Sequence, residues 1–525
     1  MLPSVDVPHP ATAENLQGQE TPGPPPSPKT LLREEPLSVR ITRNLNFQNP
    51  LWTAIRKKNA DVYHATENPK GIISMGVSEN KLLKHAIVEH LRPTLDLVPE
   101  QLFYGIDITG SRRLRESIAA MVNRHFDPAL TIEADHITVH NGSASAVDIF
   151  SYAVCEPDEA ILIAAPYYGG LDFYTAMRAD NKLIGVPMSP VEMFDPEAHV
   201  RLLDAALHRA LGEGLLVRGL ILVNPHNPLG LCHSRALLEN ILRFAHRNSL
   251  HVLADEVYAL SVFHHELKSL QSTTAVDINS QGTSAVLEAE AAMADPSTPR
   301  NSAVAPQLAP LDFTTPFHSV LSLANLRDLI NPRLVHVIHG MSKDFCVGGL
   351  RIGYFISPWD PQFNAAVKSV SVFAWYANTI DALACAFFRD PEWLVTFLQM
   401  SREALARMYV RAAAFLQRHG VNYVPSRAGP FLWMDLRPFC KRRKDAGMMI
   451  GAGPGLDEDL EEISVSVDEE IALFDRLMNH GVYLASGRAF HASTSGWFRL
   501  TFALDPTELD LGLQRISKAL GLVAA

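Results

Sequence analysis

Cysteine is scarce in this sequence: the chain of 525 residues contains five. Their number is odd, they lie far apart, and no two of them have the CxxC spacing. This pattern argues against a disulfide framework and against a zinc site. We therefore expect a reducing compartment and no bound metal.

Long apolar runs and clustered positive charge are also absent. No run approaches the ~18 apolar residues that would cross a bilayer. Residues 1–29 have neither the basic start and apolar stretch of a secretory signal nor the arginine-rich composition of a mitochondrial presequence. The net charge is -11, and the basic cluster "KRRK" at 441–444 is short. We therefore expect a cytoplasmic protein with no membrane and no nucleic-acid partner.

Three stretches have the composition of linkers. Residues 1–42 are rich in proline, glycine, glutamate and threonine, residues 272–310 interrupt an otherwise globular sequence, and residues 441–466 combine glycine with a charged segment. We expect a disordered N-terminal arm, a low-complexity surface insertion and an irregular loop, respectively. Within the insertion, "VLEAEAAMA" could form a transient helix.

Between these stretches, apolar strands alternate with amphipathic helices. "HITVHNG" leads into "SASAVDIFSYAVC", "GLILVNPHNPLG" leads into "RALLENILRFAHRNS", and "VHVIHGMSKDF" follows the insertion. The alternation predicts an α/β fold with a mostly parallel sheet covered by helices on both faces. Long helices and short strands after about residue 390 predict a smaller α+β domain. We place the large domain at 96–385 and the small domain at 43–95 and 386–525.

Polar residues stand at the ends of four predicted strands. They are Ser143 with Ala144, Asn227, Asp255 with Tyr258, and Ser342 with Lys343. Ligands of open parallel sheets bind beyond the carboxyl ends of the strands, so these positions are expected to converge.

The stretch "NGSASA" at 141–146 lies between a strand and a helix. Its backbone N–H groups and hydroxyls could hold a phosphate. A plain helix N-cap is the alternative interpretation. Arg351, in "GGLRIGY", could add a bidentate phosphate contact or instead form a salt bridge to a carboxylate.

Lys343 follows a serine at the end of a buried run, where a lysine is costly unless it is paired, neutralised or used covalently. Its amine can form a Schiff base with a carbonyl cofactor. Asp255 ends the strand "HVLA", and Tyr258 can share its face, whereas Glu256 is expected to point away into solvent. A phosphate site, an aldehyde-binding lysine and an aspartate for a pyridinium nitrogen together describe a site for pyridoxal 5′-phosphate.

Several motifs carry a resemblance to a known family. "NPHNPLG", "ADEVY" and "SKD…GGLRIGY" resemble, in order and spacing, the signatures of class-I (fold-type I) aminotransferases, over residues 45–520 outside the insertions. "ISMGVSENKLL", "PYYGG" and "GWFRLTF" look most like the 1-aminocyclopropane-1-carboxylate (ACC) synthase-like proteins of animals and fungi. The resemblance implies a seven-stranded sheet, pyridoxal 5′-phosphate as cofactor, a small-molecule amino acid as substrate, and a homodimer.

The resemblance also implies roles for residues around the cofactor ring. Lys343 would bind the cofactor through a Schiff base and later act as general base. Asp255 would keep the pyridine nitrogen protonated, while Tyr258 and Asn227 would hydrogen-bond the phenolate oxygen. Tyr168, the second tyrosine of "PYYGG", would stack on the ring, with simple core packing as the alternative.

Further residues match positions that hold the phosphate and the substrate in that family. Ser143, Ala144, Ser342 and Arg351 would hold the phosphate. Arg499, in "GWFRL", would grip the α-carboxylate of the substrate with its planar fork.

Glu79 and Tyr104 match the family in part. Glu79, in "SEN", corresponds to the acidic residue of an "AEN" motif near the substrate side chain, with a helix N-cap partner as the alternative. The family uses a tyrosine from the partner subunit to reach the cofactor phosphate, which suggests Tyr104. Alignment to Gly110 places Ile108 at that position instead.

These residues represent machinery that several reactions share. We expect an aminotransferase acting at the α-carbon of an amino acid or amino-bearing metabolite. ACC synthase-like chemistry or a C–S lyase, by elimination at Cγ or Cβ, is the alternative, because a few side chains decide the outcome. A non-catalytic regulatory protein is a remote alternative, since the lysine, aspartate, tyrosine, asparagine and arginines of the site are all present.

Overall fold

The computed structural model describes residues 37–46, 49–94, 98–104, 107–272, 284–288, 290, 311–440 and 464–522. The chain divides into two compact units, Met1–Phe47 and Gln48–Ala525. Helix α1 (Val39–Asn46) belongs to the first unit, and every other element belongs to the second. The domain boundaries expected from the sequence stay predictions. Most of the expected arm and of the expected loop at 441–466 lies outside the described residues.

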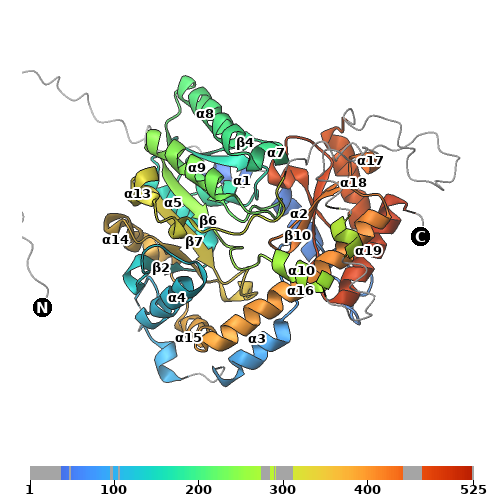
Figure 1. The fold of residues 1–525 in the computed structure, drawn as a ribbon, viewed down its shortest axis with the longest axis horizontal. Helices are drawn as coiled ribbons and strands as arrows, with labels where there is room; N and C mark the ends of the chain where they lie inside the picture. The colour runs from blue at the N-terminus through green and yellow to red at the C-terminus, as the bar shows by residue number, and fades with distance from the viewer. Residues whose placement is uncertain are drawn as a thin grey trace, which may run out of the picture. The chain divides into compact units, whose positions relative to one another are not determined.

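The larger sheet has seven strands in the spatial order β2-β8-β7-β6-β5-β3-β4 (Figure 1). In chain order they are β2 (Ile137–His140), β3 (Ala160–Ala165), β4 (Lys182–Pro187), β5 (Val217–Val223), β6 (His251–Asp255), β7 (Val335–Gly340) and β8 (Gly353–Ile356). Strands β7, β6, β5, β3 and β4 are parallel, whereas β8 runs antiparallel to both of its neighbours. The predicted α/β fold with a mostly parallel sheet is confirmed.

Alternate residues of these strands face opposite layers of helices. In β3, Ile161 and Ile163 pack with α5 (Ser143–Val154), whereas Leu162 belongs to the cluster that contains α8 (Pro196–Gly212) and α9 (Arg235–Arg247). Because both faces are covered, the inner strands are mostly apolar, as the sequence indicated.

The remaining helices begin where the local sequence provides a start. α8 and α16 both start with Asp-Pro, and Asp195 and Asp390 each accept hydrogen bonds from two N–H groups of the first turn. Helix α16 spans Pro391–Arg418, and further helices of this unit are α2 (Pro50–Asn59), α3 (Lys84–Leu91), α4 (Arg112–His125), α6 (Leu171–Ala176), α7 (Pro190–Phe194), α10 (His264–Ser272), α13 (Leu326–Leu329), α14 (Pro361–Val370), α15 (Asn378–Phe387), α17 (Arg437–Cys440), α18 (Val467–Asn479) and α19 (Pro506–Leu520).

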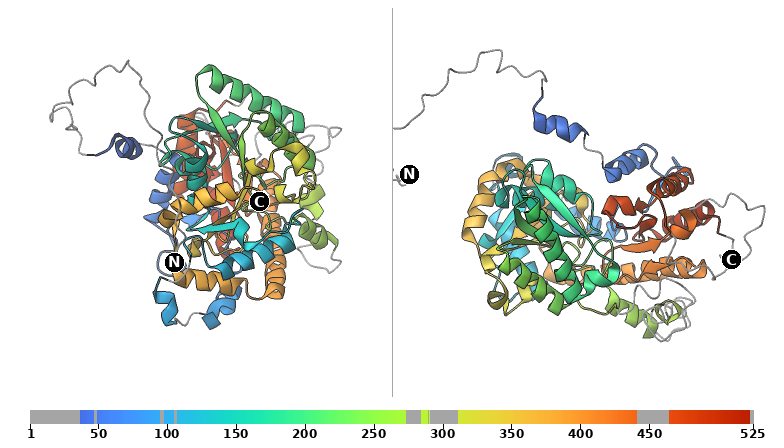
Figure 2. Two further views of the ribbon diagram at one scale, coloured as in Figure 1. Left: turned by 90° about the vertical axis from the view of Figure 1, so that its left-hand side faces the viewer. Right: turned by 90° about the horizontal axis from the view of Figure 1, so that it is seen from above.

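A second, antiparallel sheet lies in the C-terminal part of the chain, in the order β12-β13-β10-β9. Its strands are β9 (Tyr423–Val424), β10 (Phe431–Asp435), β12 (Ala485–Ser486) and β13 (Trp497–Thr501). They share an apolar core with α16, α18 and α19, and these red and orange elements lie beside the large sheet (Figures 1 and 2). A short parallel pair, β1 (Ile73–Ser74) with β11 (Val482–Tyr483), joins the segment before α3 to this part of the protein.

Part of the insertion between β6 and β7 is packed into the protein. Residues 284–288 form a helix, and Val286 is buried in the same apolar cluster as α16. Glu290 is 1% exposed and accepts hydrogen bonds from Arg427, Tyr409 and Tyr423. This differs from the expectation of a surface stretch with a transient helix, while residues 291–310 lie outside the described residues.

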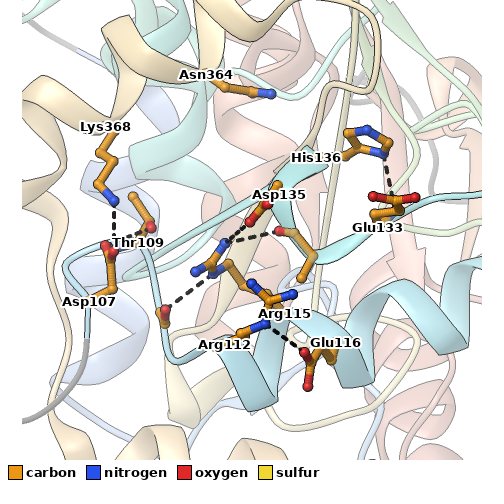
Figure 3. A network of polar contacts seen from close by, with 12 residues as sticks. Asp107, Thr109, Arg112, Arg115, Glu116, Glu133, Asp135, His136, Asn364 and Lys368 are labelled. Carbon is orange, nitrogen blue, oxygen red and sulfur yellow. Dashed lines mark hydrogen bonds and ion pairs between the residues drawn. The ribbon is translucent and has the colours of Figure 1, made fainter.

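A polar network fixes the loop that precedes α4 (Figure 3). Arg115, on α4, donates hydrogen bonds to the carbonyl oxygens of Gly110 at 3.3 Å and Ala134 at 3.1 Å. Its guanidinium also pairs with Asp135 at 3.3 Å. One arginine therefore ties the loop to the start of β2.

A second contact of this loop reaches α14. Lys368 pairs with Asp107 at 2.7 Å (Figure 3). Burial alone would raise the pKa of Asp107, but hydrogen bonds from Lys368 and Thr109 lower that pKa to about 2. The segment from Asp107 to Gly110 is thus fixed from two sides.

Over the described residues, no single helix is long and apolar enough to cross a membrane. The segments Pro361–Ala374 and Asn378–Phe387 together have the length and composition of a membrane span, but they are bent by 117° relative to each other.

Candidate active site

The predicted strand-end residues converge around the amine of Lys343. The charged groups that act on this amine are Arg499, Glu79, Asp255 and Arg351. Lys343 Nζ donates a hydrogen bond to the carbonyl oxygen of Ser78 at 2.6 Å. Residues that are far apart in the sequence therefore form one site, at the carboxyl ends of the strands.

The environment of Lys343 favours its neutral amine. Burial, assisted by the positive charge of Arg499, lowers the pKa of Lys343 to about 8. Near neutral pH an appreciable fraction of the amine is then unprotonated, which is the form that attacks a carbonyl carbon.

Asp255 has a half-buried carboxylate that pairs with no cation among the described residues. Burial raises the pKa of Asp255 to about 6, opposed by the backbone N–H of Val257 and by the charges of His339 and Lys343. Among the described residues that N–H, at 3.3 Å, is its hydrogen-bond donor. A protonated pyridine nitrogen would supply the missing positive partner.

Tyr258 and Asn227 each have one polar contact already fixed by the protein. The hydroxyl of Tyr258 lies 2.7 Å from Ser78 Oγ, and burial raises the pKa of Tyr258 well above its ordinary value. Asn227 Oδ1 accepts a hydrogen bond from Arg499 Nη1 at 2.8 Å. The amide N–H₂ of Asn227 therefore remains a donor for a ligand oxygen, and the Tyr258 hydroxyl is a donor as well when Ser78 Oγ donates to it.

The start of α5 has the close packing that a phosphate cradle requires. A Cβ on Gly353 would lie 2.0 Å from the backbone nitrogen of Ser143, so β8 passes directly against the first turn. Gly142, with φ +113°, would place a Cβ 2.4 Å from Arg351 Nη2. The guanidinium of Arg351 therefore lies over the N–H groups that begin the helix at Ser143 and Ala144.

Ser342 and Arg351 are linked through one glycine. Arg351 Nη1 donates a hydrogen bond to the carbonyl oxygen of Gly348 at 3.0 Å, and a Cβ on Gly348 would lie 3.6 Å from Ser342 Cβ. The four residues predicted to hold a phosphate are thus neighbours in the structure.

Arg499 is the most enclosed cation of the site. It is 2% exposed, and its Nη2 donates to the carbonyl oxygen of Gly76 at 2.7 Å. The rings of Phe431 and Phe490 lie 4.9 Å and 4.7 Å from its guanidinium carbon. Two aromatic rings therefore pack against the guanidinium, whose N–H groups can hold a carboxylate in its plane.

Tyr168 lies in the same region. Its phenol acts electrostatically on Tyr258 and Arg499 and is hydrogen-bonded to Tyr174. The structure brings it to the site, and its stacking role stays a prediction.

Glu79 and Tyr104 are placed differently from the other predicted residues. The Glu79 side chain is 53% exposed and pairs with Lys81 at 3.8 Å, although its charge reaches Lys343. It is not an N-cap partner, because α3 begins at Lys84 after Leu83. Tyr104 is 92% exposed and its ring stacks on Trp375 with centroids 5.6 Å apart, so it does not reach the site of its own chain.

Glu256 was expected to be solvated, and this is wrong. It is fully buried and accepts hydrogen bonds from Ser319 Oγ at 2.6 Å and Val320 N at 2.9 Å. Burial raises the pKa of Glu256 to about 8. Its partners lie more than 60 residues away in the sequence, where no local pattern points to them.

Two further residues of the site were not found from the sequence. Ser78 contacts both Lys343 and Tyr258, and in "SEN" the acidic Glu79 is the residue that matches the family motif. Asp344 is buried beside Lys343 and accepts hydrogen bonds from His339 Nε2 and Leu260 N, both at 2.8 Å. It thereby holds the turn that carries Tyr258 against the segment that carries Lys343.

Residues 70–516 match the family described as "Aminotransferase class I and II". The chain belongs to this family. Membership implies pyridoxal 5′-phosphate as the cofactor, and the site fits it: an amine of lowered pKa, a half-buried carboxylate that pairs with no cation among the described residues, and a glycine-lined helix start next to an arginine.

Individual relatives agree with the assignment. The chain is 30% identical to the "1-aminocyclopropane-1-carboxylate synthase-like protein 1" of Takifugu rubripes, over 97% of this chain and 74% of that protein. It is 28% identical to the "Probable aminotransferase aclI" of Aspergillus oryzae, over 86% of this chain and 91% of that protein. A Thermus thermophilus aspartate aminotransferase, 18% identical, has the same fold with a TM-score of 0.64 over 92% of this chain and 100% of that chain.

Proposed function

We propose that the protein is a pyridoxal-phosphate-dependent aminotransferase that takes the amino group from an α-amino acid. The observation that carries this proposal is the amine of Lys343, with a pKa of about 8, among the charges of Asp255, Arg499 and Arg351. The cofactor, when bound, supplies an aldehyde that accepts the amino group and an electron-withdrawing ring.

The chain's own residues bind, orient and move protons. Lys343, as a free amine, would move a proton at the substrate α-carbon. Asp255 would hold the pyridine nitrogen of the cofactor in its protonated form, and Tyr258 and Asn227 would donate hydrogen bonds to its phenolate oxygen. Arg499 holds the substrate carboxylate, which fixes the α-carbon in front of Lys343.

The purified protein is tested by adding each amino acid to the cofactor-loaded form without a keto acid and recording its absorbance. An aminotransferase converts the cofactor to its amine form and releases one equivalent of keto acid. The Lys343→Ala variant is the control, because it retains the phosphate-binding residues but lacks the amine. A wild-type protein that gains no Schiff-base absorbance on addition of pyridoxal 5′-phosphate refutes the proposal.

Elimination is a second candidate function. The relative that covers 97% of the chain is named for similarity to ACC synthase. The charge of Glu79 acts on Lys343, which agrees with a position of this carboxylate near the substrate side chain. In the same experiment with S-adenosylmethionine or cysteine conjugates, a lyase keeps its Schiff base and accumulates ACC, or a thiol with ammonia. A cofactor-loaded protein that does neither is the non-catalytic alternative.

A homodimer is part of the proposal. Large apolar side chains are exposed on two neighbouring segments: Leu102 (66%), Phe103 (68%), Tyr104 (92%), Val372 (51%) and Phe373 (79%). The segments are joined by a hydrogen bond from Asn378 to the carbonyl oxygen of Phe103 and by the stacking of Tyr104 on Trp375. A second copy of the chain would cover this surface and bring Tyr104 to the partner's cofactor phosphate.

The dimer is tested by light scattering across a dilution series. Wild-type protein is expected at twice the chain mass, and Phe373→Glu is expected to be monomeric. An active monomer would refute this part of the proposal.

We also propose a cytoplasmic location, supported by five free thiols, and cell fractionation tests it.

A further inference from the structure

Two buried hydrogen-bond donors next to the substrate position have no acceptor. Arg499 uses Nη1 for Asn227 and Nη2 for the carbonyl oxygen of Gly76. Among the described residues, its Nε and the hydroxyl of Tyr483 have no partner. A buried donor without an acceptor is unfavourable and is rare in folded proteins. A ligand that accepts from both would remove this cost.

Tyr483 is held firmly beside Arg499. Its carbonyl oxygen accepts a hydrogen bond from Met75 N at 2.9 Å, in the register set by the β1-β11 pair. A Cβ on Gly76 would lie 2.6 Å from Cε1 of the tyrosine ring, and the carbonyl oxygen of the same Gly76 is bonded to Arg499. The ring, the glycine and the guanidinium therefore form one contiguous layer.

The phenol of Tyr483 remains a donor over the working pH range. It is fully buried, and burial raises the pKa of Tyr483 well above its ordinary value. The positive charge of Arg499 opposes this rise in the pKa, and Tyr168 adds to the rise. The groups that act on this hydroxyl are thus the residue expected to grip the carboxylate and the residue expected to stack on the cofactor.

Tyr483 also forms a wall of a pocket. The pocket has a volume of about 400 Å³ and lies between α2, α18 and the turn at 486–489. Tyr483 lines this space, whereas Arg499 is not among its lining residues.

We propose that Tyr483 donates a hydrogen bond to the substrate carboxylate, alongside Arg499. This inference rests on the proposed function. The carboxylate would then be held by one charged fork and one neutral hydroxyl, and the site would select α-amino acids over amines of the same side chain that lack the carboxylate.

The test compares wild type with Tyr483→Phe, using cofactor-loaded protein and two probes. The first probe is the amino acid that gives the largest absorbance change in the screen of twenty, and the second is the amine obtained by decarboxylating it. We expect the dissociation constant of the amino acid to rise about tenfold or more, as for a lost hydrogen bond to a charged group. The dissociation constant of the amine should stay within about twofold.

A stability measurement separates this role from a structural one. Tyr483→Phe removes a hydroxyl that has no partner, so the cofactor-free variant should melt at the same temperature as wild type or higher. Tyr423→Phe is the matched control, because Tyr423 is also fully buried but its hydroxyl bonds Glu290 at 2.9 Å. The control should melt at a lower temperature and keep the selectivity for the amino acid over the amine.

The outcomes also separate this inference from the proposed function. If wild type loads the cofactor and responds to amino acids but Tyr483→Phe has unchanged selectivity, the inference alone is wrong. A lowered melting temperature with unchanged selectivity would show a structural role for Tyr483 and overturn it as well. A wild-type protein that responds to no amino acid refutes the proposed function and this inference together.

Discussion

Replacing Glu290 by glutamine should destabilise the C-terminal part of the protein strongly. Glu290 and Arg427 pair at 2.6 Å with side chains 1% and 9% exposed, so water does not screen the pair. Removing one partner of a buried pair leaves the other charge uncompensated, at a cost of about 3–5 kcal/mol. That is a large part of the ~5–15 kcal/mol by which a typical domain is stable.

The assay is urea unfolding followed by tryptophan fluorescence. The matched control is Asp510→Asn, whose pair with Arg411 has side chains 39% and 45% exposed and should contribute less than about 1 kcal/mol. The double variant Glu290→Gln with Arg427→Met should recover part of the loss, because no unpaired charge is left. A free energy of unfolding for Glu290→Gln within about 0.5 kcal/mol of wild type would refute the packed position of the insertion.

The same reasoning changes the expectation for removing the insertion. A surface loop could be deleted without consequence, but deletion of residues 273–310 would leave Arg427 buried and unpaired. Arg427 also holds the loop that contains Asn227 and Gly230, since its backbone N–H donates to the carbonyl oxygen of Gly230 at 2.7 Å. We therefore expect a deletion variant that is less stable and binds the cofactor more weakly.

Three further predictions concern the site and its surroundings. Arg499→Lys should weaken substrate binding by about 1.5–3 kcal/mol, and unchanged steady-state kinetics would contradict its assignment. Gly353→Ala should lower cofactor affinity about 5- to 150-fold by overpacking the start of α5 at Ser143. A Cβ at Gly349 would meet nothing within 4 Å, so the control Gly349→Ala should bind the cofactor as wild type does. Absorbance titration with pyridoxal 5′-phosphate measures both affinities. Burial lowers the pKa of His226 to about 3. As the pH falls below about 6.5, His226 therefore becomes protonated in the unfolded chain while it stays neutral in the folded protein. The free energy of unfolding should then decline by up to about 1.4 kcal/mol per pH unit. His226→Gln should show a flatter decline in urea midpoint between pH 6.5 and 4.5, and an unchanged slope would contradict this.

The strands and most of the site could be predicted because they depend on short patterns. Lys343, Asp255 and Asn227 each follow an apolar run, and topology alone brings the ends of such runs together. Arg499 required the match to a family motif, since nothing in "GWFRL" by itself indicates that the side chain faces the large sheet.

The parts that could not be predicted depend on partners distant in the sequence. Glu256 sits next to Asp255, yet its hydrogen bonds come from Ser319 and Val320, in the segment after the insertion. Glu290 lies in a stretch of low-complexity composition, and its partner Arg427 is 137 residues away. The sequence indicated a transient helix at "VLEAEAAMA", but no local pattern showed that this helix would pack.

The bond between Gly76 and Arg499 has a consequence for the protein while it is being synthesised. The two residues are 423 positions apart, so at the usual 5–20 residues per second the ribosome adds Arg499 about 20–85 seconds after Gly76. Until then the Gly76–Ser78 segment lacks the arginine that anchors it, and for most of the interval it also lacks Tyr483. All seven strands of the large sheet lie before residue 357, so a chain stalled before residue 499 contains the whole sheet sequence but cannot complete the substrate side of the site.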